Sequence, residues 1–168
     1  VPESTVKPRF EYSKQKRQIM RTLDLLIIDE ISMVRADILD AIDSILRRFR
    51  EHNKPFGGVQ LLMIGDLQQL TPIVRPDEEK LLSRYYNTPY FFDSKALQST
   101  QYVTIELTKV FRQQDKVFID ILNHFRDGHV SDEDFDILNK RYQPNFTPDE
   151  NSDYIHLTTH NRIADNIN

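Results

Sequence analysis

The sequence feature that most constrains the fold is residues 25–32, a run of apolar side chains that stops abruptly on two adjacent carboxylates, Asp29 and Glu30. A short apolar run bounded by charge predicts a strand buried on both faces, because a solvated face would require alternating polar residues. Residues 59–66 repeat this design after an intervening helical pattern. Two buried strands joined by a helix predict a βαβ unit, and therefore an α/β fold with a mostly parallel sheet flanked by helices.

The two carboxylates fall at the carboxyl end of the first predicted strand, which is the edge of open α/β sheets where ligands bind. Phosphoryl hydrolysis uses such a pair: one carboxylate holds Mg²⁺, and the next orients or deprotonates a water molecule. We therefore predict Asp29 as the metal ligand and Glu30 as the base. The alternative is that the pair only ends a strand and caps the next helix.

Two further polar residues follow predicted strand ends. Gln69 comes after the second strand, and its amide can sense a γ-phosphate without adding charge; the alternative is a solvent-exposed glutamine in a glycine turn. Arg112 follows a third predicted strand at residues 102–107. Its guanidinium could neutralise the charge that develops on a transferred phosphoryl group, whereas the alternative is a surface salt bridge.

Composition limits the classes of protein that fit. A chain of 168 residues is long enough for one domain and the start of a second. The formal net charge of -4 does not favour nucleic-acid binding, so any DNA contact must be local or come from other segments. The lack of cysteine excludes disulfides and thiolate metal sites, and no signal peptide or membrane-length apolar run is present. We expect a cytosolic protein.

A helical pattern beginning at Arg35 predicts the amphipathic crossover helix between the two strands. Ile42 and Leu46 fall on its apolar face, and Asp40 and Asp43 fall on the opposite face with several arginines. We expect that opposite face to be solvated.

The rest of the chain predicts further elements. Helices are expected at residues 77–86, from Asp115 to a glycine cap at Gly128, and after an N-cap at Ser131. A last short strand is expected at residues 154–158. Three aromatic residues are predicted to lie in the core rather than to stack on nucleic-acid bases: Tyr86, Phe91 and Phe92.

Three motifs taken together are far more specific than any single residue. They are a Walker B element at residues 26–34, a third helicase motif at 65–73 and a fourth at 107–113. On these motifs the chain resembles the superfamily 1 DNA helicases that move 5′ to 3′, of the PIF (petite integration frequency) and RecD type. Residues 125–128 and 157–162 also match the spacing of this family. The resemblance implies a P-loop NTPase-like (RecA-like) fold, here incomplete.

The resemblance also implies roles for individual residues. Asp29 would bind Mg²⁺, Glu30 would activate water, and Gln69 would link the γ-phosphate to contact with the DNA strand. Arg112 would reach the γ-phosphate. A group at the start of the second motor domain would touch the DNA backbone, although a polar helix cap is an equally good interpretation: Thr159, His160 and Asn161.

By the same resemblance, residues 1–150 would be a partial first motor domain and residues 151–168 the start of the second. The full-length protein would be an ATP-dependent 5′-to-3′ DNA helicase that uses ATP and Mg²⁺ and binds single-stranded and partly duplex DNA as a monomeric motor. Roles in DNA repair, recombination and telomere maintenance are implied, in the cytoplasm or, in a eukaryote, the nucleus or mitochondrion. Two alternatives stay open: a helicase-like region of a RecD-type nuclease subunit or relaxase, and a non-catalytic scaffold with this fold.

These residues do not contain the phosphate-binding loop of the family, Gly-x-x-x-x-Gly-Lys-Ser/Thr. We therefore interpret them as the middle of a helicase, and we expect them alone neither to hydrolyse ATP nor to unwind DNA. A sheet that lacks its neighbouring strand exposes an edge, which we expect to favour self-association.

Overall fold

The computed structural model describes residues 12–148 and 154–167, and the chain divides into two units, Val1–Thr108 and Lys109–Asn168. The assignment of residues 1–150 and 151–168 to two motor domains stays a prediction.

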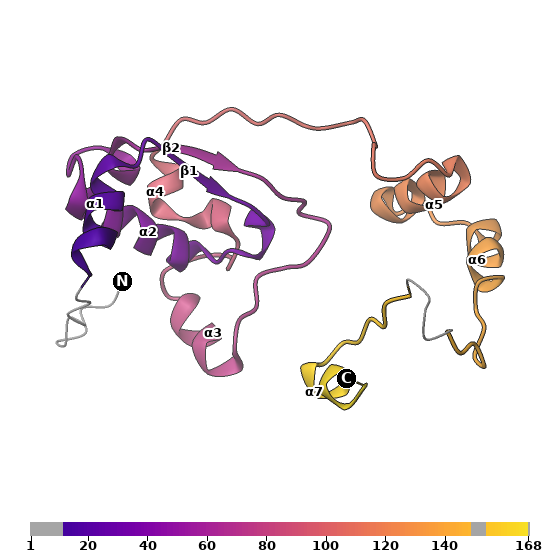
Figure 1. The fold of residues 1–168 in the computed structure, drawn as a ribbon. Helices are drawn as coiled ribbons and strands as arrows, with labels where there is room; N and C mark the ends of the chain where they lie inside the picture. Colours follow the sequence, from indigo (N-terminus) through magenta and orange to yellow (C-terminus); the bar gives the residue numbers. More distant parts are fainter. Residues whose placement is uncertain (1–11, 149–153, 168) are drawn as a thin grey trace. The chain divides into compact units, whose positions relative to one another are not determined.

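The first unit contains the predicted βαβ arrangement (Figure 1). Strand β1 (Leu25–Ile28) pairs in parallel with β2 (Gln60–Met63), in a register that sets Leu25 opposite Gln60 and Ile28 opposite Met63. The connection runs through the 3-10 turn η1 (Ile31–Met33), helix α2 (Ala36–Phe49) and a second 3-10 turn, η2 (Pro55–Gly58). The strand–helix–strand order and the parallel pairing are as expected from the two apolar runs.

The strands are not buried on both faces, which corrects the expectation drawn from their continuous apolar sequence. Leu26 and Ile28 pack against the core, but Leu25 and Ile27 on the other face are 42% and 54% exposed. Side chains alternate across a strand, and in the described part of this unit α2 and its neighbours cover one face of the sheet. The apolar side chains on the second face are therefore not covered by any element that the structure describes.

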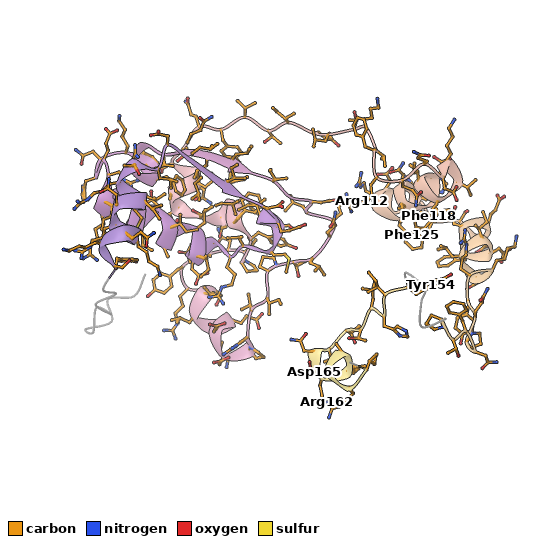
Figure 2. The ribbon with its side chains drawn as sticks, viewed as in Figure 1. Arg112, Phe118, Phe125, Tyr154, Arg162 and Asp165 are labelled. Carbon is orange, nitrogen blue, oxygen red and sulfur yellow. The ribbon has the colours of Figure 1, made fainter. Side chains whose placement is uncertain are left out.

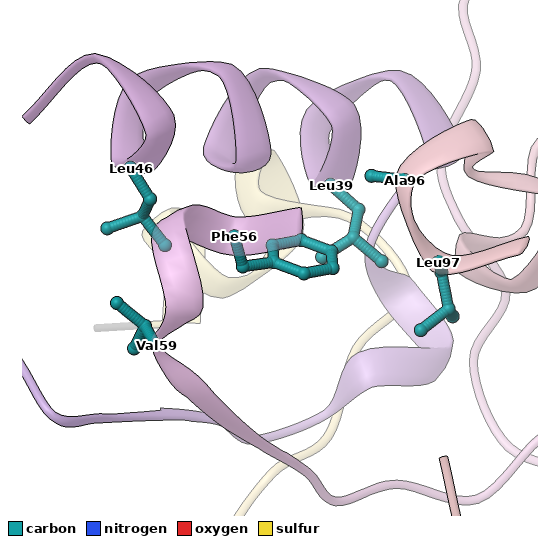
Figure 3. Packing of buried hydrophobic residues seen from close by; sticks show 6 residues of the cluster. All are labelled: Leu39, Leu46, Phe56, Val59, Ala96 and Leu97. Atoms are coloured by element: carbon teal, nitrogen blue, oxygen red, sulfur yellow. The ribbon is translucent and has the colours of Figure 1, made fainter. Parts of the chain in front are cut away.

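The core lies between that covered face, α2, η2 and the short helix α4 (Lys95–Gln98). Phe56 of η2 is at its centre with 1% of its surface exposed, although its backbone has a left-handed φ of 51°. Figure 3 shows how the buried side chains of these elements meet. They are Leu39, Leu46, Phe56, Val59, Ala96 and Leu97.

The polar face of α2 is partly buried rather than solvated, because Asp40 and Asp43 serve as hydrogen-bond acceptors for other segments. Asp40 Oδ1 accepts from Ser94 Oγ (2.6 Å) and Ala96 N (2.9 Å), and Oδ2 accepts from Tyr86 Oη (2.8 Å). Burial acts to raise the pKa of Asp40, but the hydrogen bonds from Ser94, Ala96 and Tyr86 outweigh it and lower the pKa. An aspartate in a helix can thus anchor the segment that follows it.

Asp43 plays a similar part for η2. Its carboxylate accepts from the backbone N–H of Phe56 and from Arg47 Nε one helical turn away. The bond to Phe56 holds the left-handed residue in place, and the ion pair with Arg47 supplies the charge that a buried carboxylate requires.

The remaining helices of this unit are α1 (Lys14–Thr22), capped by Ser13, and α3 (Pro76–Leu82), which ends four residues before the expected position. Arg35 joins α3 to the start of α2, since it bonds Asp37 with two nitrogens and Glu78 with the third. The hydrogen bond that Arg35 donates to Asp37 is the largest cause of the raised pKa of Arg35.

The aromatic residues behave differently from one another. Tyr86 is buried, as predicted, and its burial, followed by its bond to Asp40, raises its pKa. Phe91 packs against the core at the 3-10 turn η3 (Phe91–Asp93), whereas Phe92 is 40% exposed and stacks on Tyr90.

The predicted third strand at residues 102–107 is not formed. The segment has no regular structure, and its apolar side chains are exposed, Val103 by 87% and Ile105 by 79%. A strand requires a partner for its backbone groups, and none pairs with this segment among the residues that the structure describes.

The second unit consists of α5 (Lys116–Asp127), α6 (Asp132–Asn139) and α7 (Asn161–Ile167). The predicted caps are confirmed: Gly128 adopts a left-handed φ of 70° after α5, and Ser131 opens α6. Asp115, predicted only as the start of the helix, also caps it, because its carboxylate accepts from Phe118 N. The strand expected at residues 154–158 is absent, because the described residues there are exposed and unpaired with any strand. No helix among the described residues is long and apolar enough to cross a membrane.

Helices α5 and α6 are joined by a ring contact between Phe125 and Phe135 and by a bond of 3.0 Å from His124 Nδ1 to Asp134. The N–H and hydroxyl of Ser131 also donate to Asp134, at 2.8 Å each. These bonds, the backbone N–H of Ser131 first and the His124 ring next, lower the pKa of Asp134.

The lowered pKa of Asp134 predicts an acid-labile α5–α6 pair. A carboxyl whose pKa is depressed by folding stabilises the fold fully above its unfolded pKa of about 3.9, and that contribution is lost as the pH falls through the lower folded value. We expect helicity of the second unit, followed by circular dichroism, to fall as the pH drops below about 4. Asp134→Asn should be less stable at neutral pH and should show a weaker pH dependence in that range; an unchanged acid transition would contradict this.

Candidate active site at the carboxyl edge of the sheet

The carboxyl ends of the two strands are tied together by backbone hydrogen bonds that continue beyond the strands themselves. Ile64 N donates to Ile28 O, and Ile31 N donates back to Ile64 O, both at 2.9 Å. The turn that carries Asp29 and Glu30 is therefore fixed against the first residues after β2. This brings two of the motifs identified in the sequence to one edge of the sheet, as expected.

Asp29 is exposed at this edge, and its Oδ1 accepts from the backbone N–H of Glu30 at 2.9 Å. This bond orients the exposed carboxylate through one of its two oxygens. Such a group suits a hard divalent cation, which prefers carboxylate oxygen. Among the described residues no cluster of three or more aspartate, glutamate or histidine side chains could hold a metal by itself. A cation at Asp29 would need further oxygen ligands, such as phosphates and water.

Glu30 has a left-handed backbone, with φ 51° and ψ 44°, and its side chain is exposed. A non-glycine residue in this region is uncommon and costs on the order of 1–2 kcal/mol. Here the conformation turns the chain sharply out of β1 so that η1 can begin at Ile31. Strain of this kind is concentrated at functional sites, where the surrounding structure holds it.

Gly65 permits the close approach between the two motifs. A Cβ atom at this position would lie 3.0 Å from Ile31 Cγ2 and from Ile31 N, and 3.1 Å from Ser32 N. Only a residue without a side chain fits this contact without a shift of the neighbouring backbone. The loop after β2 is therefore seated directly on the turn that carries the two carboxylates.

The contact at Gly65 predicts that Gly65→Ala disturbs both stability and the site. Displacement of the 31–32 backbone by a few tenths of an ångström should cost about 1–3 kcal/mol, the usual range for overpacking. Thermal unfolding would measure the loss, and ATP hydrolysis by the encoded protein with the same substitution would show the displacement of Glu30. A variant with unchanged melting temperature and rate would contradict the role assigned to this contact.

Gln69 is held by the residue that follows Gly65. Its Nε2 donates to Asp66 Oδ2 at 3.0 Å, its backbone N–H donates to Asp66 O at 3.2 Å, and Gln68 N donates to Asp66 Oδ1 at 3.0 Å. Gln69 is exposed, as expected for a glutamine in a turn. Its amide is nevertheless held by the hydrogen bond to Asp66.

Ser32 lies in the turn η1 and was not among the predicted site residues. Its side chain is 1% exposed, and its hydroxyl makes no hydrogen bond within the described part of the chain. A hydroxyl three residues after a strand-end aspartate carries no signal of its own in the sequence, since serine in that place usually caps or contacts solvent.

Arg112 belongs to the second unit, where it is exposed at a bend just ahead of α5 (Figure 2). The extended segment before it is not a strand, so the prediction that Arg112 follows a strand end was wrong. Its role at a γ-phosphate stays a prediction.

The residues predicted to contact DNA lie at the beginning of α7 and are exposed. Thr159 Oγ1 lies 2.9 Å from His160 Nδ1, and the backbone N–H of Ile163 donates to His160 O. Asn161 is the first residue of the helix. The three residues thus form the polar start of a helix. Their contact with DNA stays a prediction.

Comparison with known proteins gives the family. The model of the PIF1-like helicase family matches residues 2–136, most of the chain. This chain belongs to the PIF1-like helicases. It is 44% identical over 111 residues to the ATP-dependent DNA helicase RRM3 of Saccharomyces cerevisiae, and 45% identical over 109 residues to the human ATP-dependent DNA helicase PIF1.

The structural match covers more of the chain. A Pif1 helicase from Bacteroides, solved in complex with ADP-AlF3 and single-stranded DNA, has a TM-score of 0.90 and 38% sequence identity over 99% of this chain. The α/β, RecA-like fold class predicted for this PIF1-like helicase is thus confirmed. The matches cover 66% and 64% of this chain but only 14% and 16% of RRM3 and human PIF1, and 38% of the Bacteroides helicase.

Proposed function

We propose that this chain supplies the water-activating half of the ATPase centre of a 5′-to-3′ DNA helicase that moves on single-stranded DNA and unwinds duplex DNA. The observation that carries the proposal is the seating of the Gly65 loop on the Asp29–Glu30 turn. Two carboxylates and an amide are thereby gathered at one sheet edge, which a scaffold has no physical need to do.

Within this centre Asp29 would hold Mg²⁺ together with the phosphates of ATP, because the ion commonly binds one or two carboxylates and keeps oxygen ligands from its substrate. When bound, the metal would neutralise charge on the β- and γ-phosphates. Glu30 would take a proton from the water that attacks the γ-phosphorus. The new P–O bond forms as the bond to the β–γ bridging oxygen breaks, and ADP and inorganic phosphate are released.

Residues of the second unit would complete the motor. Arg112 would stabilise the negative charge on the γ-phosphoryl oxygens, a role for which guanidinium is well suited. Thr159, His160 and Asn161 would donate hydrogen bonds to phosphates of the DNA backbone. Support for these two roles comes from the family to which the chain belongs.

The test uses the encoded protein with whatever sequence flanks these residues in its gene. We expect ATP hydrolysis that is stimulated by single-stranded DNA, and strand displacement from a duplex with a 5′ single-stranded tail but not from one with a 3′ tail. Displacement only from the 3′-tailed duplex would overturn the direction. Absence of hydrolysis in a protein that contains a phosphate-binding loop would overturn the proposal in favour of a scaffold.

Residues 1–168 expressed alone should not hydrolyse ATP. No backbone amides of a Gly-x-x-x-x-Gly-Lys-Ser/Thr loop are present in this sequence to hold the β- and γ-phosphates, so the Asp29–Glu30 pair has no positioned substrate. A phosphate-release assay with Mg²⁺, with and without single-stranded DNA, measures this. A clear rate from this chain, abolished by Glu30→Gln, would contradict the prediction.

A further inference from the structure

The Gln69 side chain is joined to the carboxylate of Asp66 by a hydrogen bond of 3.0 Å, and this bond has a fixed direction. An ionised carboxylate has no hydrogen to donate and only accepts. A glutamine amide has a donating end, Nε2, and an accepting end, Oε1. Of the two ways in which the flat amide could face Asp66, only the one with Nε2 toward the carboxylate makes a hydrogen bond, and the other opposes two acceptors.

The carboxylate itself is held in place from two sides. Its second oxygen accepts from Gln68 N, and the backbone carbonyl of Asp66 accepts from Gln69 N. One residue earlier, Gly65 is packed on the backbone of Ile31 and Ser32. The position of the Gln69 amide is therefore set through Asp66 from the same turn that carries Glu30.

We propose that Asp66 is a positioning residue which fixes the orientation of the Gln69 amide, so that Oε1 is presented as an acceptor to the reacting water and one N–H of Nε2 remains for phosphate oxygen. The inference rests on the proposed function, since it names how Gln69 takes part in hydrolysis. Asp66 itself need not touch nucleotide or water to have this effect.

The orientation matters because the two groups that Gln69 would meet have opposite requirements. Water must give up a proton to Glu30, so an acceptor beside it helps to direct its other hydrogen. Phosphate oxygen only accepts, so Oε1 turned toward it would be repulsive. An amide free to rotate would spend part of its time in the wrong orientation, and the rate would fall in proportion.

The variant that tests this is Asp66→Asn, which keeps the size of the side chain and can still accept from Gln68 N. With its oxygen on Gln68 N, its own amide presents a donor to Gln69, so it pairs with Oε1 and favours the reversed orientation of the Gln69 amide. In the encoded protein we expect kcat for DNA-stimulated ATP hydrolysis to fall about 3- to 10-fold, the range set by one exposed hydrogen bond, with a smaller change in KM for ATP. Asp66→Glu, which remains acceptor-only, should recover part of the loss.

A double-mutant comparison separates positioning from a general structural role. In a Gln69→Ala background Asp66→Asn should have no further effect on kcat, because the group that it orients has been removed. Gln68→Ala is the matched control: it removes a neighbouring amide but retains the backbone N–H that bonds Asp66, and should leave the rate unchanged. Melting temperatures of all variants should stay close to that of wild type.

Two results would overturn the inference while the proposed function stands. One is an unchanged kcat in Asp66→Asn; the other is an equal fall in the wild-type and Gln69→Ala backgrounds, which would make Asp66 a structural residue of the loop. If the wild-type protein shows no DNA-stimulated hydrolysis, both the proposed function and this role of Asp66 are rejected together. That case is recognised because Glu30→Gln then has no rate to remove.

Discussion

Glu30→Gln should abolish DNA-stimulated ATP hydrolysis while ATP still binds. The glutamine has the same size and fits the same left-handed turn, but it cannot accept a proton from the attacking water. Loss of a general base typically costs a factor of about 10²–10⁴ in rate. Initial rates of phosphate release measure the first effect, and the fluorescence of a labelled ATP analogue measures binding.

The control for this experiment is Glu133→Gln in α6, which removes the same charge from an exposed glutamate in the second unit. It should hydrolyse ATP at the wild-type rate. If Glu30→Gln retained more than about a tenth of wild-type kcat, outside the range expected for a general base, another group would be the base and Glu30 only a strand-end carboxylate.

Asp40→Ala should be the most destabilising single change in the first unit. Asp40 is buried and accepts from Ser94, Ala96 and Tyr86, and also from Lys95 N at 3.2 Å. Its removal would leave buried donors unsatisfied, and hydrogen bonds to a charged acceptor are worth about 1.5–3 kcal/mol each. We expect the free energy of unfolding to fall by about 3–5 kcal/mol, given that such effects are not additive.

Urea denaturation of the encoded protein measures this loss as a lower midpoint. Tyr86→Phe is the graded comparison, because it removes one donor and leaves the Asp40 carboxylate with the others; it should cost about 1.5 kcal/mol, the low end of that range. Equal effects from the two variants would show that the buried carboxylate does not act as the common acceptor.

The elements that could be predicted are those encoded by local pattern. The apolar runs predicted β1 and β2, helical spacing predicted α2, a glycine marked the end of α5, and a serine N-cap marked the start of α6. Asp29, Glu30 and Gln69 were placed at the correct sheet edge because parallel strands bring their carboxyl ends together. For each of these elements the deciding interaction lies within a few residues of the sequence.

The errors arose where distant segments decide the outcome. Asp40 and Asp43 read as solvated positions of α2, and only the return of the chain at residues 56 and 94–96 makes them buried acceptors. Residues 102–107 have the composition of a strand but no strand beside them within the described structure. Neither the burial of a helix face nor the pairing of a strand is encoded in the segment itself.

The left-handed backbone of Glu30 bears on how this site persists over evolutionary time. Glycine or asparagine would relieve the conformation, so the substitutions that stabilise this turn are those that delete the carboxylate. A lineage that kept the fold only as a scaffold would be expected to drift toward such residues, because a gain of about 1 kcal/mol would carry no penalty. Glutamate at φ 51° goes against the local preference of the backbone. It is therefore the residue expected where selection acts on the carboxylate rather than on the turn.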